Sequence, residues 1–260
     1  FGASVMVLSP VVNKMLENLG LTETFRILAI VFGVITVICS FFVVQPDPSY
    51  YMEKASKVLS ADEFKQFTPS EVLRTPIYYC QVVSMILSSG AYLVIIPFIK
   101  DIAMDRGMSS HIGVVAVMVT GAANAAGRIL APMVSDKLGR TRSIIACCVI
   151  SALACVGLIF ANTAATYLVA IFLVAFAYGG TSGINPVIST ELFGAKNSGT
   201  NYGLVMISIA ISSVLFGKIS ASAAGSSFTP IFILCAAVCV VPVVLMSWLH
   251  WFCGKAGKNI

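Results

Sequence analysis

Charged residues are scarce in this chain of 260 residues. Asp, Glu, Lys and Arg together make up 10% of it, whereas hydrophobic residues make up 58%. A soluble domain carries about a quarter charged residues, so this chain lacks the polar groups needed to cover a surface exposed to water. Lipid is the solvent that suits such a composition. The composition therefore excludes an ordinary soluble domain and predicts an all-α membrane protein.

Histidine is scarce as well, and the cysteines do not make up for it. The chain has two histidines, His111 and His250, and its eight cysteines lie almost all inside apolar runs without metal-ligand spacing. We interpret the cysteines as small apolar packing residues. We expect neither a metal site nor a cofactor.

The start of the chain lacks a charged n-region. It begins at Phe1 inside an apolar run, which is not the pattern of a signal peptide. We expect that the beginning of a longer protein is missing. The net charge of +5 comes from basic residues between the apolar runs, which indicates membrane topology rather than binding to nucleic acid.

Long apolar runs are what the chain does have. About 20 apolar residues are needed to cross the hydrocarbon core as a helix. One partial run covers 1–10, and seven full runs cover 25–45, 76–99, 111–133, 143–161, 165–190, 201–222 and 228–252. The longest polar stretch, 45–75, is too polar to enter the membrane. It is long enough to form a short surface helix.

The basic residues between the runs predict the orientation. Loops 46–75, 134–142 and 191–200, together with the tail after 252, hold ten Lys and Arg residues, whereas the opposite loops hold four. Such an excess marks the cytoplasmic side. Trp248 at the end of the last run fits that side, because amphipathic rings prefer the membrane interface.

Two basic residues fall inside the runs. Arg128 lies eight residues before Asp136, so it is about 12 Å from the cytoplasmic end of its helix. An arginine near the middle of the membrane costs about 2.5 kcal/mol or more unless it faces a cavity or a partner. We therefore take Arg128 as a candidate site residue, with a purely structural ion pair as the alternative. Lys218 lies near the outer end of its helix and can reach the interface.

Three runs carry polar residues at spacings of three and four, so each set shares one helix face. The sets are Gly121, Asn124, Arg128 and Pro132; Gln81, Ser84, Ser88 and Tyr92; and Tyr178, Ser182, Asn185 and Ser189. Such stripes can join helices or line an aqueous cavity, and three stripes with one charge favour the cavity. The candidates for substrate binding are Arg128, Asn124, Tyr178, Ser182 and Gln81.

Glycine and proline are concentrated in one of these runs. Gly179, Gly180, Gly183 and Pro186 lie within nine residues. Both residue types weaken a helix, and broken helices mark binding sites in transporters. The pattern predicts a weakened or broken helix at this point.

The loop after Arg128, at Asp136–Arg142, carries the sharpest motif and is called the motif loop below. Its core, Asp136-Lys137-x-Gly139-Arg140-x-Arg142, resembles the cytoplasmic loop signature of the major facilitator superfamily. A glycine permits the tight turn, and the arginines can pair with acids. We assign a role in conformational exchange to the following set: Gly127, Asp136, Lys137, Gly139, Arg140 and Arg142.

Two further stretches narrow the resemblance. Phe67–Tyr79 and Glu191–Gly203 resemble the oxalate/formate antiporter family, which is close to the monocarboxylate transporters. The resemblance implies a major facilitator bundle of twelve helices, of which this chain holds the end of helix 5 through helix 12. Residues 1–45 then end the N-terminal six-helix half, 46–75 form a cytoplasmic linker, and 76–260 form the C-terminal half with a short cytoplasmic tail.

The resemblance also implies a function. It indicates a secondary transporter of the cell membrane, not an enzyme, that works by alternating access with a small organic anion and a co-transported proton or an exchanged anion. In that family a helix-8 arginine contacts the substrate carboxylate, and Arg128 has that position. Members that carry oxalate place a lysine in helix 11 where this chain has Ile209. One arginine suits one carboxylate, so we expect formate, lactate or pyruvate, with dicarboxylate exchange as the alternative.

Two other classes compete with a transporter. Gly180-Thr181-Ser182-Gly183 resembles the serine motif of rhomboid intramembrane proteases, which would need a histidine base within reach of Ser182. His250 lies in a later run, but at its end. A membrane sensor with the same fold that transports nothing is the third class. Saturable uptake would separate it from a transporter.

Overall fold

The computed structural model describes residues 2–42, 66–222 and 228–255. The chain forms two compact units. One is Val7–Lys65, and the other combines Phe1–Met6 with Gln66–Ile260. Most of the polar linker predicted between 46 and 75 lies outside the described residues. Its last part contains the short helix α3 (Pro69–Val72), whose N-cap Thr68 and Glu71 form a capping box.

From Val7 onward, helix α1 (Gly2–Ser40) makes up most of the described part of the smaller unit, and the helix is interrupted at Gly20. Gly20 has a φ of 74°, a value that glycine adopts without steric cost. The segment 11–24, which we expected to be a polar break between two runs, is helical on both sides of Gly20. Leu, Met, Lys and Glu in this segment are good helix formers, and this explains why the helix continues through it.

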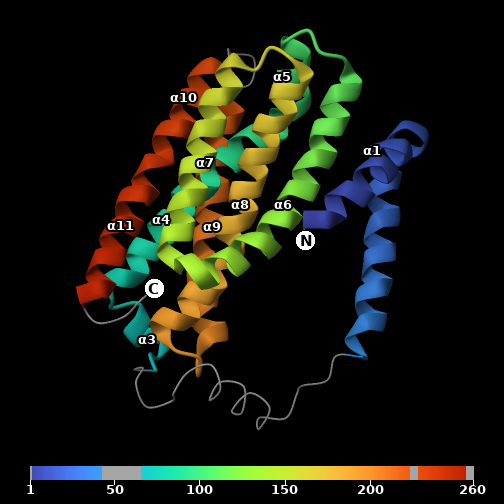
Figure 1. Ribbon diagram of the computed structural model, residues 1–260. Coiled ribbons are helices and arrows are strands. Elements are labelled where there is room, and N and C mark those ends of the chain that lie inside the picture. The colour runs from blue at the N-terminus through green and yellow to red at the C-terminus, as the bar shows by residue number, and fades with distance from the viewer. Residues whose placement is uncertain (1, 43–65, 223–227, 256–260) are drawn as a thin grey trace. The chain divides into compact units, whose positions relative to one another are not determined.

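Seven helices among the described residues are long and apolar enough to cross a membrane. After α1, Figure 1 shows the following elements: α4 (Pro76–Ile95), η1 (Ile96–Phe98), α5 (Ile99–Asp105), α6 (Ser110–Leu138), α7 (Arg140–Phe160), α8 (Ala164–Phe193), α9 (Ser198–Ser222), α10 (Thr229–Val238) and α11 (Val240–Lys255). The pairs α4–α5 and α10–α11 each make one span. The described residues contain no strand, so the all-α prediction is confirmed.

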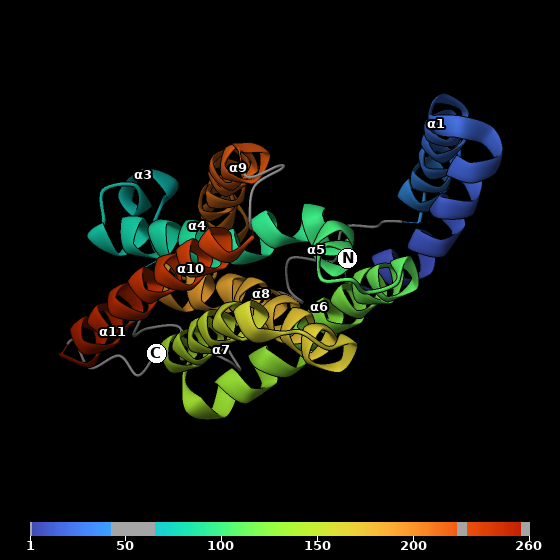
Figure 2. The same cartoon turned by 90° about the horizontal axis from the view of Figure 1, so that it is seen from above.

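Helix α8 is the centre of the larger unit. It packs against α6 on one side and α7 on another, while α4 packs against α9 (Figure 2). Helices α10 and α11 contact both α7 and α4. Tyr167 on α8 is fully buried and donates a hydrogen bond to the backbone oxygen of Ile99 at 2.6 Å, which fixes the end of the bundle opposite the motif loop.

The prediction of a broken helix at residues 178–186 is wrong. Helix α8 is continuous from Ala164 to Phe193. Its glycines instead let α6 approach: a methyl group on Gly179 would clash with the backbone oxygen of Asn124, and one on Gly183 would lie 2.9 Å from the backbone oxygen of Arg128. On α6, a methyl group on Gly127 would clash with the backbone oxygen of Phe176. Small residues thus serve close helix packing here.

The described parts of the four loops assigned to one side do share one end of the bundle. Arg140 bonds Glu191, with 2.9 Å between Nε and Oε1. Thr141 Oγ1 lies 3.0 Å from His250 Nδ1, and the backbone N–H of Phe67 donates to the oxygen of Phe193 at 3.0 Å. These contacts join the linker end, the α6–α7 loop, the α8–α9 loop and the end of α11. The assignment of that end to the cytoplasm stays a prediction.

Candidate functional site

Arg128 is held by side chains from two helices. Its Nε donates to Asn124 Oδ1 at 3.1 Å, one turn earlier on α6. Asn124 Nδ2 in turn lies 3.4 Å from the hydroxyl of Tyr92 on α4. Side chains on a helix tilt toward its N-terminus, so the guanidinium lies on the far side of its own Cα from the motif loop. It is therefore deeper in the bundle than the backbone position alone suggests.

Aromatic rings complete the surroundings of Arg128. Tyr92 and Tyr178 of α8 stack in parallel, with 4.0 Å between ring centroids and 5° between planes. Tyr202 of α9 lies close enough to Arg128 for the guanidinium charge to act on its hydroxyl. Helices α4, α6, α8 and α9 thus each contribute a polar side chain to the region of Arg128. This site is called the arginine cluster below, and consists of Arg128, Asn124, Tyr92, Tyr178 and Tyr202.

The sequence predicted most of the arginine cluster but not all of it. Arg128, Asn124 and Tyr178 were candidates, whereas Tyr92 was assigned to a stripe without a role. Tyr202 was noted only within a stretch shared with the oxalate/formate family. A single tyrosine at the start of a span carries no local signal, because the packing of α9 on α4 and α8 decides what it contacts.

Gln81 lies away from the cluster. It is fully buried, and its Nε2 is 3.4 Å from both the backbone oxygen and Oδ1 of Asn185 on α8. Along α4 it is about 16 Å nearer the motif loop than Tyr92. Its Oε1 has no hydrogen-bond partner within the described part of the chain. The contact with Asn185 joins α4 to α8, which is the role that polar residues often have between membrane helices.

Ser182 is buried on α8, next to Gly183, which approaches the backbone of Arg128. It therefore lies beside α6 at the level of the cluster. His250, the base that a protease would need, is 3.0 Å from Thr141 at the loop end. Along α8, Ser182 lies about 13 Å from Glu191 at that same end. The geometry therefore does not support a serine–histidine pair.

An apolar gap adjoins the cluster on the side away from the motif loop. It is lined by Tyr92, Ile95, Ile96, Ile99, Thr120, Ile171, Val174 and Ala175. Most of these side chains are aliphatic, and the gap between them is too small to admit a water molecule, so it is not a substrate cavity.

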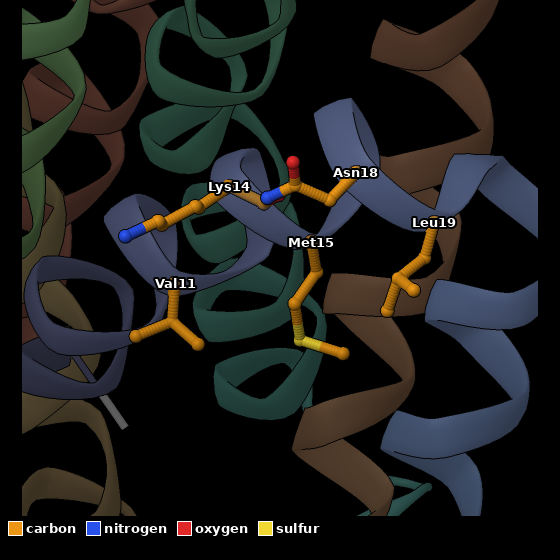
Figure 3. A pocket seen from close by; sticks show the side chains of 5 residues that line it. All are labelled: Val11, Lys14, Met15, Asn18 and Leu19. Carbon is orange, nitrogen blue, oxygen red and sulfur yellow. The ribbon is translucent and has the colours of Figure 1, made fainter.

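A second hollow lies on the smaller unit (Figure 3). Its lining is Val11, Lys14, Met15, Asn18 and Leu19, all from the first part of α1. All five described lining residues come from one helix, and they bring together no set of convergent polar groups, so the hollow is not a candidate site.

The motif loop forms a second polar cluster, centred on Arg140. Its guanidinium pairs with Asp136 one turn before it and with Glu191 of α8 at 2.9 Å. It also donates to Ser135 Oγ at 2.6 Å and to the backbone oxygen of Pro132 at 3.3 Å. Gly139, at a φ of 94°, makes the turn between α6 and α7. The expected pairing of Arg140 with an acid is confirmed, although Glu191 was not singled out.

The other predicted loop residues have different surroundings. Lys137 and Arg142 are exposed, as expected of basic residues at a membrane surface. Gly127 is not part of the loop structure, because it lies in mid-helix against Phe176 of α8. Its role in the structure is close packing of α6 on α8.

Comparison with known proteins agrees with this fold. The sequence model of the Major Facilitator Superfamily matches residues 1–217. The chain belongs to the major facilitator superfamily. It is a multi-pass integral membrane protein, and the family it belongs to is one of transporters. The match ends within α9, and α10 and α11, which lie beyond it, pack on the same unit.

Two curated relatives are similar over much of the chain. An uncharacterised MFS-type transporter, YhjX of Escherichia coli (strain K12), is 31% identical over 210 residues, which is 78% of this chain and 50% of the relative. The oxalate:formate antiporter of Oxalobacter formigenes is 22% identical over 226 residues, which is 86% of this chain and 53% of the relative. The chain thus spans about half the length of the curated relatives it matches.

Proposed function

We propose that this protein is a secondary active transporter of small organic anions, chiefly monocarboxylates such as formate, lactate and pyruvate, and that it works by alternating access. The observation that carries the proposal is the arginine cluster. A guanidinium inside a membrane-spanning helix is held by Asn124, which contacts Tyr92 of α4; Tyr92 in turn stacks on Tyr178 of α8. A guanidinium is suited to binding a carboxylate through two parallel hydrogen bonds.

The charge balance favours one carboxylate per transport cycle. A bound monocarboxylate neutralises the charge of Arg128, and a charged arginine near the middle of the membrane costs about 2.5 kcal/mol or more. A second carboxylate would need another cation, since an unpaired buried ion costs several kcal/mol. In the described part of the chain, Lys218 is exposed on α9, and the partly buried Ile209 offers no charge. The neutral pair of Arg128 with a monocarboxylate is therefore the substrate-loaded state of lowest free energy.

Exchange of oxalate for formate is the second candidate. It is favoured by the name of the relative from Oxalobacter formigenes, which is similar across most of this chain. Competition by unlabelled acids during uptake separates the two candidates. Whether transport is coupled to a proton or to an exchanged anion is answered in the same assay by imposing a pH gradient or by preloading the vesicles.

We assign the Arg140 cluster a different role, the control of conformational exchange. Arg140 links the last turn of α6, through Asp136, to the last turn of α8, through Glu191. Along α6, Asp136 is about 12 Å from Arg128, so this cluster does not contact a substrate bound there. Breaking its ion pairs should change the rate of exchange between states more than the affinity for the substrate.

The test is uptake of labelled formate, lactate and pyruvate by proteoliposomes that contain the full-length protein. Saturable uptake that Arg128→Gln abolishes supports the proposal. Lys218→Gln is a matched control, because it removes a cation exposed on α9. Saturable uptake with the same affinity in Arg128→Gln and wild type would refute the proposed site. A well-folded wild-type protein with no saturable uptake of any acid would favour the sensor.

A further inference from the structure

Both the oxygen and the nitrogen of the Asn124 side-chain amide form hydrogen bonds. Arg128 has only donors, so its Nε requires the amide oxygen at 3.1 Å, and this leaves the amide nitrogen for the Tyr92 hydroxyl at 3.4 Å. The residue is also 93% buried, with a relative exposure of 7%. We infer that Asn124 is a positioning residue for Arg128, in contrast to our first assignment of Asn124 to substrate contact. This inference rests on the proposed function of Arg128.

The backbone around Asn124 is fixed by packing. Gly179 of α8 approaches the oxygen and Cα of Asn124 so closely that a methyl group would not fit between the two helices. The amide therefore projects from a position that cannot shift toward or away from α8. A short side chain on a fixed backbone can hold the guanidinium in one orientation.

Tyr92 extends the same arrangement to a second helix. Its ring stacks on Tyr178, so the ring position is set by α4 and α8 together. The hydroxyl at the edge of that stack is the partner of Asn124 Nδ2. The hydrogen-bonded chain from Tyr92 through Asn124 to Arg128 thereby makes the orientation of the guanidinium depend on where α4 lies.

The neutrality of Asn124 is as important as its shape. An amide oxygen accepts the Nε–H bond without placing a negative charge beside Arg128. An aspartate has nearly the same shape, but it would form an internal ion pair with Arg128, which is strong away from water. A substrate carboxylate would have to compete with that ion pair, whereas it does not compete with the neutral amide of Asn124.

Asn124→Asp turns this reasoning into a measurable pH dependence. In that variant a substrate carboxylate binds well only after the introduced carboxyl group has taken up a proton. Linkage then requires affinity to rise about tenfold for each unit by which pH falls. Among the described residues, the other titratable groups near the position are Arg128, Tyr92, Tyr178 and Tyr202, and none of these four ordinarily changes charge between pH 5.5 and 7.5.

The experiment is calorimetric titration of the purified full-length protein with lactate, formate and pyruvate at several pH values in that range. We expect the plot of log Kd against pH to be about one unit steeper in Asn124→Asp than in wild type. The difference in slope is the readout, so any pH dependence of the wild type cancels. If Asn124 were merely structural, Asn124→Asp would weaken binding equally at every pH, and that result would overturn the inference.

Tyr92→Phe tests the same series of hydrogen bonds, from Tyr92 through Asn124 to Arg128, without adding a charge. It also covers the case in which Asn124→Asp does not fold. It removes the hydroxyl but keeps the ring that stacks on Tyr178. We expect binding weaker by roughly two- to tenfold, as for one lost hydrogen bond, with the wild-type pH slope. Unchanged binding in Tyr92→Phe would contradict the inference.

Arg128→Gln separates the failure of this inference from the failure of the proposed function. If Arg128→Gln loses binding while Asn124→Asp behaves as wild type, Arg128 binds the substrate without the help of Asn124. If Arg128→Gln binds as tightly as wild type, the proposed site itself is wrong.

Discussion

Replacement of Arg128 by glutamine should change binding and stability in opposite directions. Glutamine keeps a polar group beside Asn124 but removes the charge and the fork that a carboxylate needs. Two charge-assisted hydrogen bonds are worth about 3 kcal/mol or more together. That energy corresponds to roughly a hundredfold or greater loss of affinity. In the absence of substrate, the loss of a partly buried charge should leave the protein as stable as before or more stable.

Thermal unfolding measures both effects on one sample. With lactate at a hundred times the wild-type Kd, ligand binding stabilises the wild type by about 2.7 kcal/mol. A hundredfold weaker variant gains only about 0.4 kcal/mol at the same concentration. The expected pattern is a Tm without lactate that is equal to or above that of the wild type, together with little further rise on adding lactate. The rise in Tm of Arg128→Lys on adding lactate should lie between those of the wild type and Arg128→Gln, since the point charge of lysine cannot make the bidentate contact.

The outcome that refutes this reasoning is specific. If Arg128→Gln still gains the full wild-type stabilisation from lactate, the carboxylate binds elsewhere. If Arg128→Gln unfolds at a much lower Tm without substrate, Arg128 is mainly a structural residue, as in the alternative reading of an intramembrane arginine. Lys218→Gln controls for the loss of one positive charge, because Lys218 is exposed on α9.

Three further predictions follow from other parts of the structure. Asp136→Asn and Glu191→Gln should each slow turnover, measured by rapid uptake, while Kd, measured by equilibrium binding, stays within a few-fold. A large loss of affinity would contradict the assigned role. Unlabelled formate, lactate or pyruvate should inhibit wild-type uptake better than oxalate does, and Ile209→Lys should shift the preference toward oxalate. Strong inhibition of the wild type by oxalate alone would show that another cation serves the site. Gly127→Ala should destabilise the protein by about 1–3 kcal/mol because its methyl group overlaps α8, whereas Gly157→Ala, with open space at that position, should be neutral or stabilising in a Tm measurement.

Features that depend on one helix at a time could be read from the sequence. Hydropathy located the spans, because lipid requires about 20 apolar residues in each of them. Arg128 stood out because a charge within such a span is costly wherever the helix packs. Its contact with Asn124 was also accessible, since residues four apart on a helix are neighbours. The turn at Gly139 followed from the motif alone.

Features that depend on which helix faces meet required the tertiary structure. The glycines of α8 have the composition of a helix break, but the closeness of α6 turns them into a packing surface. Gln81 shares a stripe with Tyr92, yet it contacts Asn185 whereas Tyr92 stacks on Tyr178, because α8 runs alongside α4 past both residues. The partners of Arg140 and Tyr92 include Glu191 and Tyr178, which are far away in sequence. Helical periodicity shows which residues share a face, but only packing shows what that face contacts, and at this site the contacts across helices hold the guanidinium in place.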